Sequence, residues 1–462
     1  MNYTDTIVAL ATPSGSGAIG IVRVSGEKAI VIADELFRSI NDKSLINQKT
    51  HTVSLGHIND GDRIIDEVLL TLFKSPKSYT GENVIEISCH GSHYIQSEII
   101  QLFIRNGCRA ANPGEFTLRA FLNGKMDLIQ AESVADLIAS DSESSHKIAL
   151  QQMRGGFSSK IKKLRKELIN FASLIELELD FSEEDVHFAD LKKFESLLKR
   201  ISHFLKYLID SFASGSVIKE GIPISIVGEP NVGKSTLLNF LLSDEKAIVS
   251  DIAGTTRDAI EDELIIDGIK FRFIDTAGIR QTNDEVESIG IEKTFKKMSN
   301  SQVILYVIDC SKLFNKNLKS QILSVEKISQ EFRNAKIIIA FNKVDLLANL
   351  DSIDLFKNFE SVNISAKTGF GVSDLKKKLI NLIHIGEIKN NDTIITNARH
   401  YDALVKANDS INNIKSGLKR ALSSDLIAID VREAIHHLGK ITGEISSDDL
   451  LGNIFSKFCI GK

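Results

Sequence analysis

An eight-residue pattern near the middle of the chain limits the possible folds more than any other feature. Residues 228–235 read GEPNVGKS and match the spacing GxxxxGK[ST]. The apolar run ISIV precedes them and TLLNFLL follows, so the sequence predicts a strand, a glycine-rich loop and a helix in that order. The glycines of such a loop let successive backbone N–H groups face a polyphosphate. This segment is therefore expected to bind nucleotide phosphates.

Three further motifs follow at the ends of predicted strands. Residues 275–278 (DTAG) come after FRFI and would place Asp275 beside Mg²⁺, while residues 365–367 (SAK) follow SVNI and would close a base pocket. Residues 342–345 (NKVD) follow KIIIAF. A carboxylate at Asp345 can accept the two N–H donors of guanine, whereas adenine offers no donor at N1. The ordered motifs therefore predict guanine-nucleotide binding.

The residues that drive hydrolysis are less clear from these motifs. Many GTPases orient the attacking water with a glutamine directly after the DxxG glycine, but this chain has Ile279 there. The acidic stretch 284–287 (DEVE) could supply a carboxylate, or it could be a solvated loop. Charge in the transition state could be neutralised by Arg257 or Arg280. Alternatively, the oxygen of Asn231 could help to hold K⁺.

The motifs lie in a chain of several domains. Its 462 residues exceed the size of one hydrophobic core, so roughly two to four domains are expected. Strands alternate with helices from about 221 to 385, and apolar residues recur at steps of three and four before and after that part. Residues 6–112 predict an α+β domain with a helical stretch at 27–40. We favour an α/β domain inserted into one helical domain over two separate helical domains.

Composition excludes several classes of protein. Lys and Arg total 56 against 61 Asp and Glu, so a generally basic nucleic-acid-binding coat is excluded, and RNA binding needs a local patch or a partner. Four cysteines without CxxC spacing argue against a disulfide framework or a zinc site and fit a cytoplasmic protein. No apolar run approaches the roughly 18–20 residues that span a bilayer, and we see no secretory signal.

Several segments together resemble the MnmE (TrmE) family of tRNA uridine-modification GTPases. They are GEPNVGKST, SDIAGTTRD, DTAGIRQTNDEVESIGIE, the opening TIVALATPSGSGAIGIVRVSG, the segment PGEFTLRAFLNGKMDLIQAE and the C-terminal FCIGK. The resemblance covers essentially the whole chain. The nucleotide motifs occur in other GTPases, whereas FCIGK and PGEF…RAFLNGK are far more specific.

The resemblance implies a multidomain fold of α/β and α parts. Residues 1–118 would form an α+β domain that binds tetrahydrofolate and dimerises. A helical domain would occupy 119–220 and 386–462, with the FCIGK motif at its end. A Ras-like P-loop G domain at 221–385 would interrupt it.

The family also implies an activity and partners. The chain would be a GTPase that works with MnmG, a protein that uses FAD and NADH. Together they would place a carboxymethylaminomethyl or aminomethyl group on C5 of the wobble uridine, position 34, of certain tRNAs. The carbon would come from 5-formyl- or methylene-tetrahydrofolate. A homodimer, a heterotetramer with MnmG and K⁺-dependent contact between G domains that activates hydrolysis are expected.

Site residues follow from the resemblance by motif. Glu287 would orient water, and Cys459 would act on the transferred carbon as a nucleophile or serve as a structural or positioning thiol. Potassium would be held by Asn231, Ser250, Ile252 and Thr255, Mg²⁺ by Ser235 and Thr256, and folate by Arg23, Glu82, Lys125 and Lys462. The GTP-binding residues would be Asn231, Val232, Gly233, Lys234, Ser235, Thr236, Ser250, Asp251, Ile252, Ala253, Gly254, Thr255, Thr256, Asp275, Thr276, Ala277, Gly278, Asn342, Lys343, Asp345, Ser365, Ala366 and Lys367.

Two rival functions differ from this one in class. A GTPase switch that scaffolds ribosome assembly would need an RNA-binding module with a basic face, and none is evident in the sequence. A free-standing folate aminomethyltransferase with a regulatory G domain would catalyse transfer without MnmG.

Overall fold

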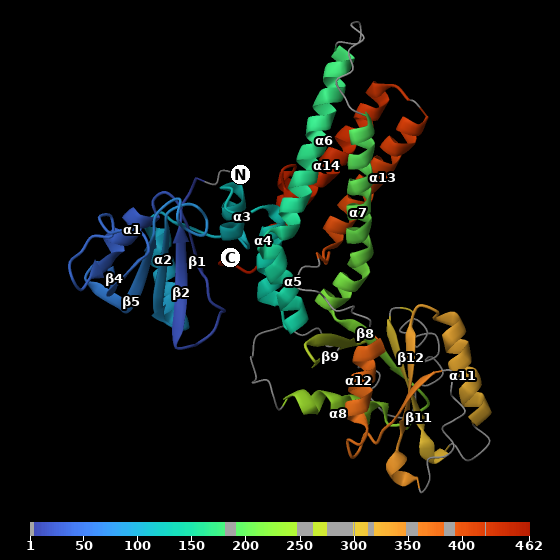
Figure 1. Ribbon diagram of the computed structural model, residues 1–462. Helices are drawn as coiled ribbons and strands as arrows, with labels where there is room; N and C mark the ends of the chain where they lie inside the picture. The colour runs from blue at the N-terminus through green and yellow to red at the C-terminus, as the bar shows by residue number, and fades with distance from the viewer. Residues whose placement is uncertain are drawn as a thin grey trace. The chain divides into compact units, whose positions relative to one another are not determined.

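The computed structural model consists of two compact units, and Figure 1 labels many of their helices and strands. The first unit comprises residues 1–139, 149–202 and 403–462, and the second comprises 140–148 and 203–402. One boundary lies directly after Ala139, at the end of a helix, and the other three fall within helices α5 (Glu143–Met153), α7 (Leu191–Glu220) and α13 (Ala398–Lys419). The structure describes residues 4–180, 191–246, 262–274, 299, 301–312, 318–347, 359–382, 393–420 and 422–462.

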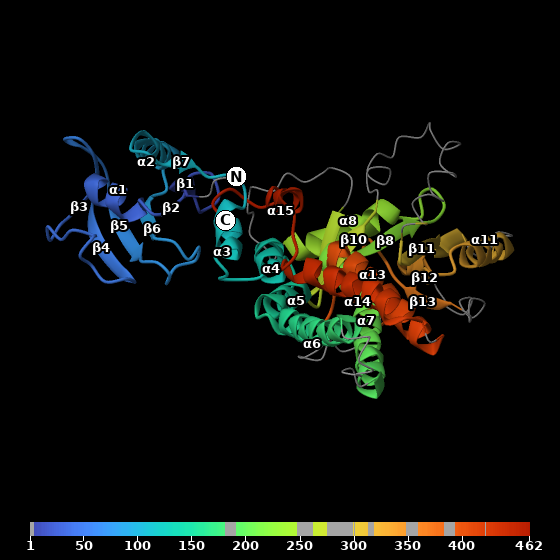
Figure 2. The same ribbon diagram turned by 90° about the horizontal axis from the view of Figure 1, so that it is seen from above.

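The N-terminal part of the first unit is a seven-stranded sheet, ordered β3-β4-β5-β6-β2-β1-β7 (Figure 2). Neighbouring strands are antiparallel except for the parallel pair β1–β7. Helices α1 (Ala29–Leu36) and α2 (His93–Arg105) bury their apolar residues against one sheet face. The strands are β1 (Ile7–Leu10), β2 (Ile19–Ser25), β3 (Phe37–Ser39), β4 (Thr52–Asp60), β5 (Arg63–Phe73), β6 (Val84–His90) and β7 (Arg109–Ala110).

The expected helical stretch at 27–40 is only partly correct. Helix α1 ends at Leu36, and the next three residues form β3, which pairs with Gly56, His57 and Ile58 of β4. Phe37 is buried in this arrangement. Strand pairing and burial of Phe37 therefore override the local helical pattern, as tertiary contacts often do.

The rest of the first unit is helical. It contains α3 (Glu115–Leu122), α4 (Leu128–Ala139), α6 (Gly156–Asp180), α14 (Ser424–Thr442) and α15 (Asp448–Phe455), with parts of α5, α7 and α13. The predicted apolar stripe of α6 is confirmed, since Ile161, Leu168 and Ile175 are buried. The stacked rings of Phe171 and Phe194 have centroids 3.9 Å apart and join α6 to α7.

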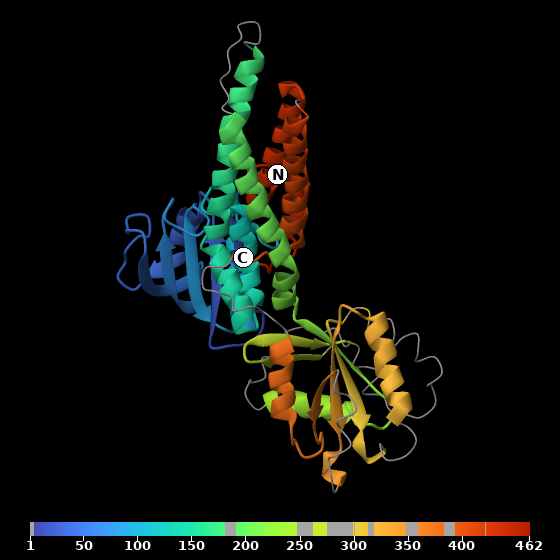
Figure 3. The same ribbon diagram turned by 45° about the vertical axis from the view of Figure 1, so that its right-hand side comes forward.

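The second unit is built on a six-stranded sheet, ordered β13-β12-β11-β8-β10-β9. Its strands are parallel except for the antiparallel hairpin β9–β10, and only β9 was missed by the sequence pattern. Helices α8 (Lys234–Lys246) and α12 (Val372–Leu382) cover one face and α11 (Leu318–Glu331) the other (Figure 3). The strands are β8 (Ile222–Val227), β9 (Asp262–Ile266), β10 (Ile269–Phe273), β11 (Val303–Asp309), β12 (Lys336–Asn342) and β13 (Glu360–Asn363).

The chain enters and leaves this α/β part at adjacent points of the second unit. The Ile395 N–H donates to Ser211 Oγ of α7 at 3.2 Å, and the stacked rings of Phe212 and Tyr401 have centroids 4.4 Å apart. Two segments far apart in sequence therefore meet where α7 leads into β8, as an insertion into a helical domain requires. Among the helices that the structure describes, none is both long and apolar enough to cross a membrane.

Candidate functional sites

The phosphate loop joins the fully buried strand β8 to the start of α8. Gly233 has φ +96°, and a Cβ there would lie 2.3 Å from Asn342 Nδ2, so only glycine fits. Asn231 also adopts positive φ, at +62°. Left-handed residues that alternate with others in a turn direct backbone N–H groups toward one concave side, which suits an anion.

Side chains from three elements hold the loop in this shape. Lys234 Nζ donates to the carbonyls of Gly228 at 2.7 Å and Glu229 at 2.8 Å. Glu229 accepts from the Gln321 amide of α11, and Gln321 Oε1 accepts from Tyr306 OH of β11 at 2.9 Å. Burial, and then the charge of Glu229, raises the pKa of Tyr306. The Tyr306 hydroxyl therefore stays a proton donor at neutral pH.

Asn342 links the phosphate loop to the predicted base-binding segment. Its Nδ2 donates to the Val232 carbonyl at 2.7 Å, and its Oδ1 accepts the Ala366 N–H at 2.9 Å. Its neighbour Lys343 donates to the Asn231 carbonyl at 2.8 Å. Two residues from the end of one strand thus fix both sides of the candidate nucleotide site.

Lys343 also forms a partly buried ion pair with Asp309, the last residue of β11. Lys343 Nζ lies 2.6 Å from Asp309 Oδ2, and the Asp309 side chain is 2% exposed. Burial alone would raise the pKa of Asp309, but hydrogen bonds from Lys343 and Ser311 hold that pKa below its ordinary value. The carboxylate therefore stays charged and restrains the lysine.

The predicted base-binding residues lie at the carboxyl ends of β12 and β13. Asp345 is exposed in the short turn Val344–Leu346 and has no hydrogen bond or ion pair with another described residue. Ser365 and Ala366 are buried, whereas Lys367 is exposed. Ser365 Oγ accepts the Thr368 N–H at 3.3 Å and stabilises the loop after β13. An exposed carboxylate beside a fixed loop can accept donors from a ligand.

Several predicted residues lie outside the described part of the chain. Of the K⁺ set only Asn231 is described, and of the Mg²⁺ set only Ser235, which is half-buried at the start of α8. The residues outside it are Ser250, Asp251, Ile252, Ala253, Gly254, Thr255, Thr256, Asp275, Thr276, Ala277, Gly278 and Glu287.

A second candidate site lies at one end of the N-terminal sheet, around Arg23 of β2. Arg23 Nε donates to Glu86 Oε1 at 2.8 Å. The guanidinium carbon lies 5.4 Å from the ring centroid of Tyr79 and 5.6 Å from that of Phe116, within cation–π range. Lys125 is exposed, and its ammonium donates to the Pro76 carbonyl at 3.0 Å.

The C-terminal tail is part of this site. Ser447 caps α15 by accepting the Leu450 N–H, and the tail that follows α15 reaches β1 and β2. Arg23 donates to the Gly461 carbonyl at 3.1 Å, and a Cβ on Gly461, whose φ is +95°, would lie 2.0 Å from the Leu10 carbonyl oxygen. Burial, then the charge of Arg23, lowers the pKa of Lys462. The tail thus places Lys462 beside Arg23, and Cys459 is exposed.

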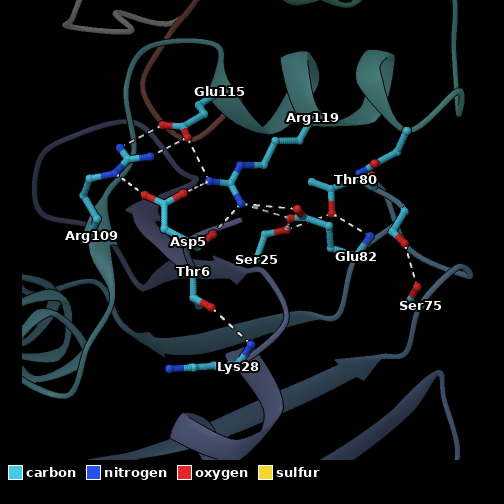
Figure 4. Close-up of polar contacts among 12 residues, drawn as sticks. Asp5, Thr6, Ser25, Lys28, Ser75, Thr80, Glu82, Arg109, Glu115 and Arg119 are labelled. Atoms are coloured by element: carbon cyan, nitrogen blue, oxygen red, sulfur yellow. Dashed lines mark hydrogen bonds and ion pairs between the residues drawn. The ribbon is translucent and has the colours of Figure 1, made fainter. Parts of the chain in front are cut away.

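Glu82 belongs to an ionic cluster that Figure 4 shows in detail. Arg119 is 1% exposed and lies 3.3 Å from both Glu82 oxygens, 2.6 Å from Asp5 Oδ1 and 3.0 Å from Glu115 Oε1. Arg109 reaches the same two acids, Asp5 at 2.5 Å and Glu115 at 2.6 Å. Three carboxylates thus face two guanidinium groups, and the surplus negative charge leaves Glu82, 19% exposed, able to accept a further donor.

The same cluster shifts the pKa of two carboxyls. The hydrogen bond from Arg109 is the main reason that the pKa of Asp5 is lowered. Burial would raise the pKa of Glu115, but hydrogen bonds from Arg109, the Asn112 N–H and Arg119 outweigh it and lower that pKa. Both acids therefore remain charged well below neutral pH.

Comparison with known proteins identifies the family. Residues 6–125 match the model described as the GTP-binding protein TrmE N-terminus, and residues 128–459 match the MnmE helical domain. Two relatives named tRNA modification GTPase MnmE are 60% identical, from Flavobacterium psychrophilum over 100% of both chains and from Flavobacterium johnsoniae over 99% of both. A third, from Christiangramia forsetii, is 58% identical over 100% of both. The chain belongs to the MnmE family.

The ionic cluster of this MnmE-family chain was missed by sequence reasoning, apart from Glu82. Asp5 and Arg109 are isolated charges in the sequence, and such charges are usually solvated. Glu115 and Arg119 gave one usable signal, because an acid and a base four residues apart on a helix are neighbours. That spacing predicts the pair but not its burial, which depends on the strands beneath α3.

Proposed function

We propose that this protein is a GTP-hydrolysing enzyme that, with MnmG, adds a carboxymethylaminomethyl or aminomethyl group to C5 of the wobble uridine of certain tRNAs. As a member of the MnmE family, the chain is a tRNA modification GTPase. The observation that carries the proposal is the end-to-end similarity to proteins of that name, at 60% identity over 100% of both chains. The substrate position, folate, K⁺ and MnmG come from the family resemblance.

For the nucleotide we propose the sites already assigned by motif. The phosphate loop would bind the phosphates through its backbone N–H groups, and Lys234 would exchange its two carbonyl acceptors for phosphate oxygens. Asp345 would accept two donors from guanine, with Asn342 holding the loops around it. This division of roles fits an exposed Asp345 and a buried Asn342.

For hydrolysis we propose that Glu287 orients the attacking water. Ser235 and Thr256 would hold Mg²⁺, and Asn231, Ser250, Ile252 and Thr255 would hold K⁺, which supplies the positive charge that an arginine provides in other GTPases. Asn231 fits a cation site, since it is an exposed residue of the phosphate loop and its amide oxygen is a neutral ligand. Exchange of Na⁺ for K⁺ at equal ionic strength should raise the rate of GTP hydrolysis strongly, and equal rates in both salts would contradict the cation site.

For the one-carbon donor we propose 5-formyl- or methylene-tetrahydrofolate at the N-terminal site. Glu82 would accept donors of the pterin ring, while Arg23, Lys125 and Lys462 would attract the anionic glutamate tail. The side chains present fit such a ligand, because the partly exposed carboxylate of Glu82 lies beside the buried Arg119, and Arg23 lies against two aromatic rings. Cys459 would face the transferred carbon, as a nucleophile or as a positioning thiol.

We further propose a cytoplasmic homodimer formed through residues 1–118 and a heterotetramer with MnmG, which would carry FAD and NADH. The helical domain would comprise 119–220 and 386–462, and the G domain would comprise 221–385. The proximity of Ser211 and Ile395 supports a single insertion point.

Nucleoside analysis of total tRNA from a deletion strain tests the function. We expect wobble uridines to lose the C5 substituent and to regain it when the gene is restored. Unchanged wobble uridines would contradict the proposal, and co-purification with ribosomal particles in place of a flavoprotein would favour the rival scaffold function.

A further inference from the structure

The Glu82 carboxylate accepts hydrogen bonds from the Ser25 hydroxyl and the Arg119 guanidinium, and the Ser25 hydroxyl in turn contacts that of Thr80. We propose that Thr80, Ser25 and Arg119 are positioning residues that hold Glu82 as a pure hydrogen-bond acceptor, so that the site selects ligands by a donor edge such as the 2-amino group of a pterin. The proposal rests on the folate site of the proposed function and extends it by naming what sets its specificity.

Three hydrogen bonds close a ring through Glu82. The Ser25 hydroxyl donates to Glu82 Oε2 at 2.7 Å, and an ionised carboxylate can only accept. The hydroxyls of Ser25 and Thr80 lie 2.8 Å apart, so Thr80 must be the donor, because Ser25 has no second hydrogen. The Glu82 N–H in turn donates to Thr80 Oγ1 at 3.2 Å. The carboxylate of Glu82 is thus tied to its own backbone.

The ring is buried at one side, which fixes the direction of its bonds. Ser25 and Thr80 are both 0% exposed. Every hydroxyl hydrogen in it is committed to an acceptor within the ring, and water cannot reach either hydroxyl to reverse the pattern. Close to Glu82 the ring therefore offers a ligand no hydroxyl donor, only the remaining acceptor positions of the carboxylate.

Arg119 holds the other side of the carboxylate. One guanidinium nitrogen lies 3.3 Å from both Glu82 oxygens, while the group as a whole is anchored by Asp5 and Glu115 (Figure 4). These long contacts orient Glu82 without using all four of its acceptor positions. A ligand with two adjacent N–H groups can therefore still be bound.

This arrangement has a direct chemical consequence for ligand choice. A pterin presents N3–H and the 2-amino group side by side, and a carboxylate held at a fixed angle can accept both. A site that depends on such hydrogen bonds discriminates strongly against an analogue that lacks the donor, because its polar groups are then unpaired. If the hydrogen-bonded ring of Ser25, Thr80 and Glu82 sets the angle of the carboxylate, loss of the Thr80 hydroxyl should selectively weaken binding of the ligand with the 2-amino group. This is expected although Thr80 does not touch the Glu82 carboxylate.

The test measures binding of two ligands to the full-length chain by calorimetry. The probes are 5-formyltetrahydrofolate and its analogue with hydrogen in place of the 2-amino group. Thr80→Val keeps the side-chain shape and removes the hydroxyl, and Thr80→Ser restores a hydroxyl. Thr442→Val is the matched control, since Thr442 is also buried in the first unit and its hydroxyl donates to the Gly439 carbonyl of its own helix. Melting temperature and GTP binding monitor folding of each variant.

We expect Thr80→Val to weaken binding of 5-formyltetrahydrofolate about tenfold and to change binding of the analogue less than about twofold. Thr80→Ser should recover most of the loss, and Thr442→Val should bind both ligands as the wild type does. Arg119→Lys keeps the charge but loses the planar guanidinium. It should also reduce the ratio of the affinity for 5-formyltetrahydrofolate to the affinity for the analogue.

Two other results would overturn the proposal, and they can be told apart. If the wild type binds 5-formyltetrahydrofolate but Thr80→Val binds it equally well, or loses both ligands equally, the positioning role is wrong and the folate site stands. If the wild type binds neither ligand, the folate site itself is wrong and the positioning role with it.

Discussion

At the scale of single residues, the four cysteines fall into two groups. Cys89, Cys108 and Cys310 are buried, and Cys459 is exposed in the C-terminal tail. Burial raises the pKa of Cys89 to about 11, with a further contribution from Asp66, and that of Cys108 to about 12. Burial, then the charge of Asp309, raises the pKa of Cys310 to about 12. Because thiolates are the reactive form, the buried three should be inert near neutral pH.

We therefore expect one fast thiol per chain when the folded protein is treated with iodoacetamide at pH 7.5. Mass spectrometry of the labelled peptides should find the modification at Cys459, and Cys459→Ser should abolish the fast phase. Fast labelling of Cys89, Cys108 or Cys310 in the native chain would show that the packing around them is looser than described.

Some residues of the two candidate sites could be assigned from the sequence, and others could not. Asn342 and Lys343 were assigned to the nucleotide site from a motif at a strand end, and the structure shows that both contact the phosphate loop. Arg119 and Asp5 were not predicted, because their contact joins residues more than one hundred positions apart, and neither periodicity nor local spacing records it. Charges in long-range clusters become visible only when the fold brings the strands and helices together.

At the scale of elements, the ionic cluster fastens α3 to the sheet. Glu115 and Arg119 of α3 are 2% and 1% exposed and bond to Asp5, just before β1, and to Arg109 of β7. The folded-state pKa values of Asp5 and Glu115 lie below their ordinary values of 3.8 and 4.5. Their contribution to the free energy of unfolding is therefore complete above about pH 4.5 and is lost as the pH falls through the lowered pKa values.

Glu115→Gln should lower the free energy of unfolding of the first unit by about 3 kcal/mol at pH 7, the lower end for breaking a buried pair, since Asp5 and Glu82 still face Arg119. The free energy of unfolding of this variant should also fall less steeply than that of the wild type as the pH is lowered. Urea titration of the full-length chain, followed by pulsed hydrogen exchange of α3 peptides, measures both effects. Glu27→Gln, an exposed glutamate, is the control. An unchanged acid dependence in Glu115→Gln would contradict this account.

The position of the C-terminal tail against β1 depends on Gly461. A Cβ at Gly461 would collide with the Leu10 carbonyl, whereas Gly452 in α15 has open space around it. Gly461→Ala should therefore release the tail, and carboxypeptidase B should remove Lys462 about tenfold faster, relative to the denatured chain. Gly452→Ala should leave that rate unchanged. If Gly461→Ala and the wild type lose Lys462 at the same normalised rate, the tail is not held at this point.

Helices with a periodic apolar pattern could be predicted from the sequence. Short strands that form by pairing with a neighbouring strand could not. The apolar stripes of α6 and α14 are buried as expected, since a period of three to four residues can only be satisfied on one helix face. Strands β3, β7 and β9 were missed because each is short, lies at the edge of its sheet and is defined by its neighbour, β4, β1 or β10. Local pattern does not encode such a neighbour. The longer strand β4 was also missed.

At the scale of the whole molecule, the chain combines two units whose chemistry differs. The second unit carries the candidate nucleotide site, and the first carries the candidate folate site with the tail. The family model for the helical domain extends from 128 to 459 and so spans the G domain within it. We propose that GTP hydrolysis in the second unit is required for tRNA modification.

The most direct test of that claim is complementation of a deletion strain, with nucleoside analysis of its total tRNA. Glu287→Ala should bind GTP normally but fail to hydrolyse it, and we expect it to leave wobble uridines without their C5 substituent. Glu285→Ala, a change in the same acidic stretch, should restore modification as the wild-type gene does. Full restoration by a Glu287→Ala protein that is shown to be inactive in hydrolysis would contradict the account.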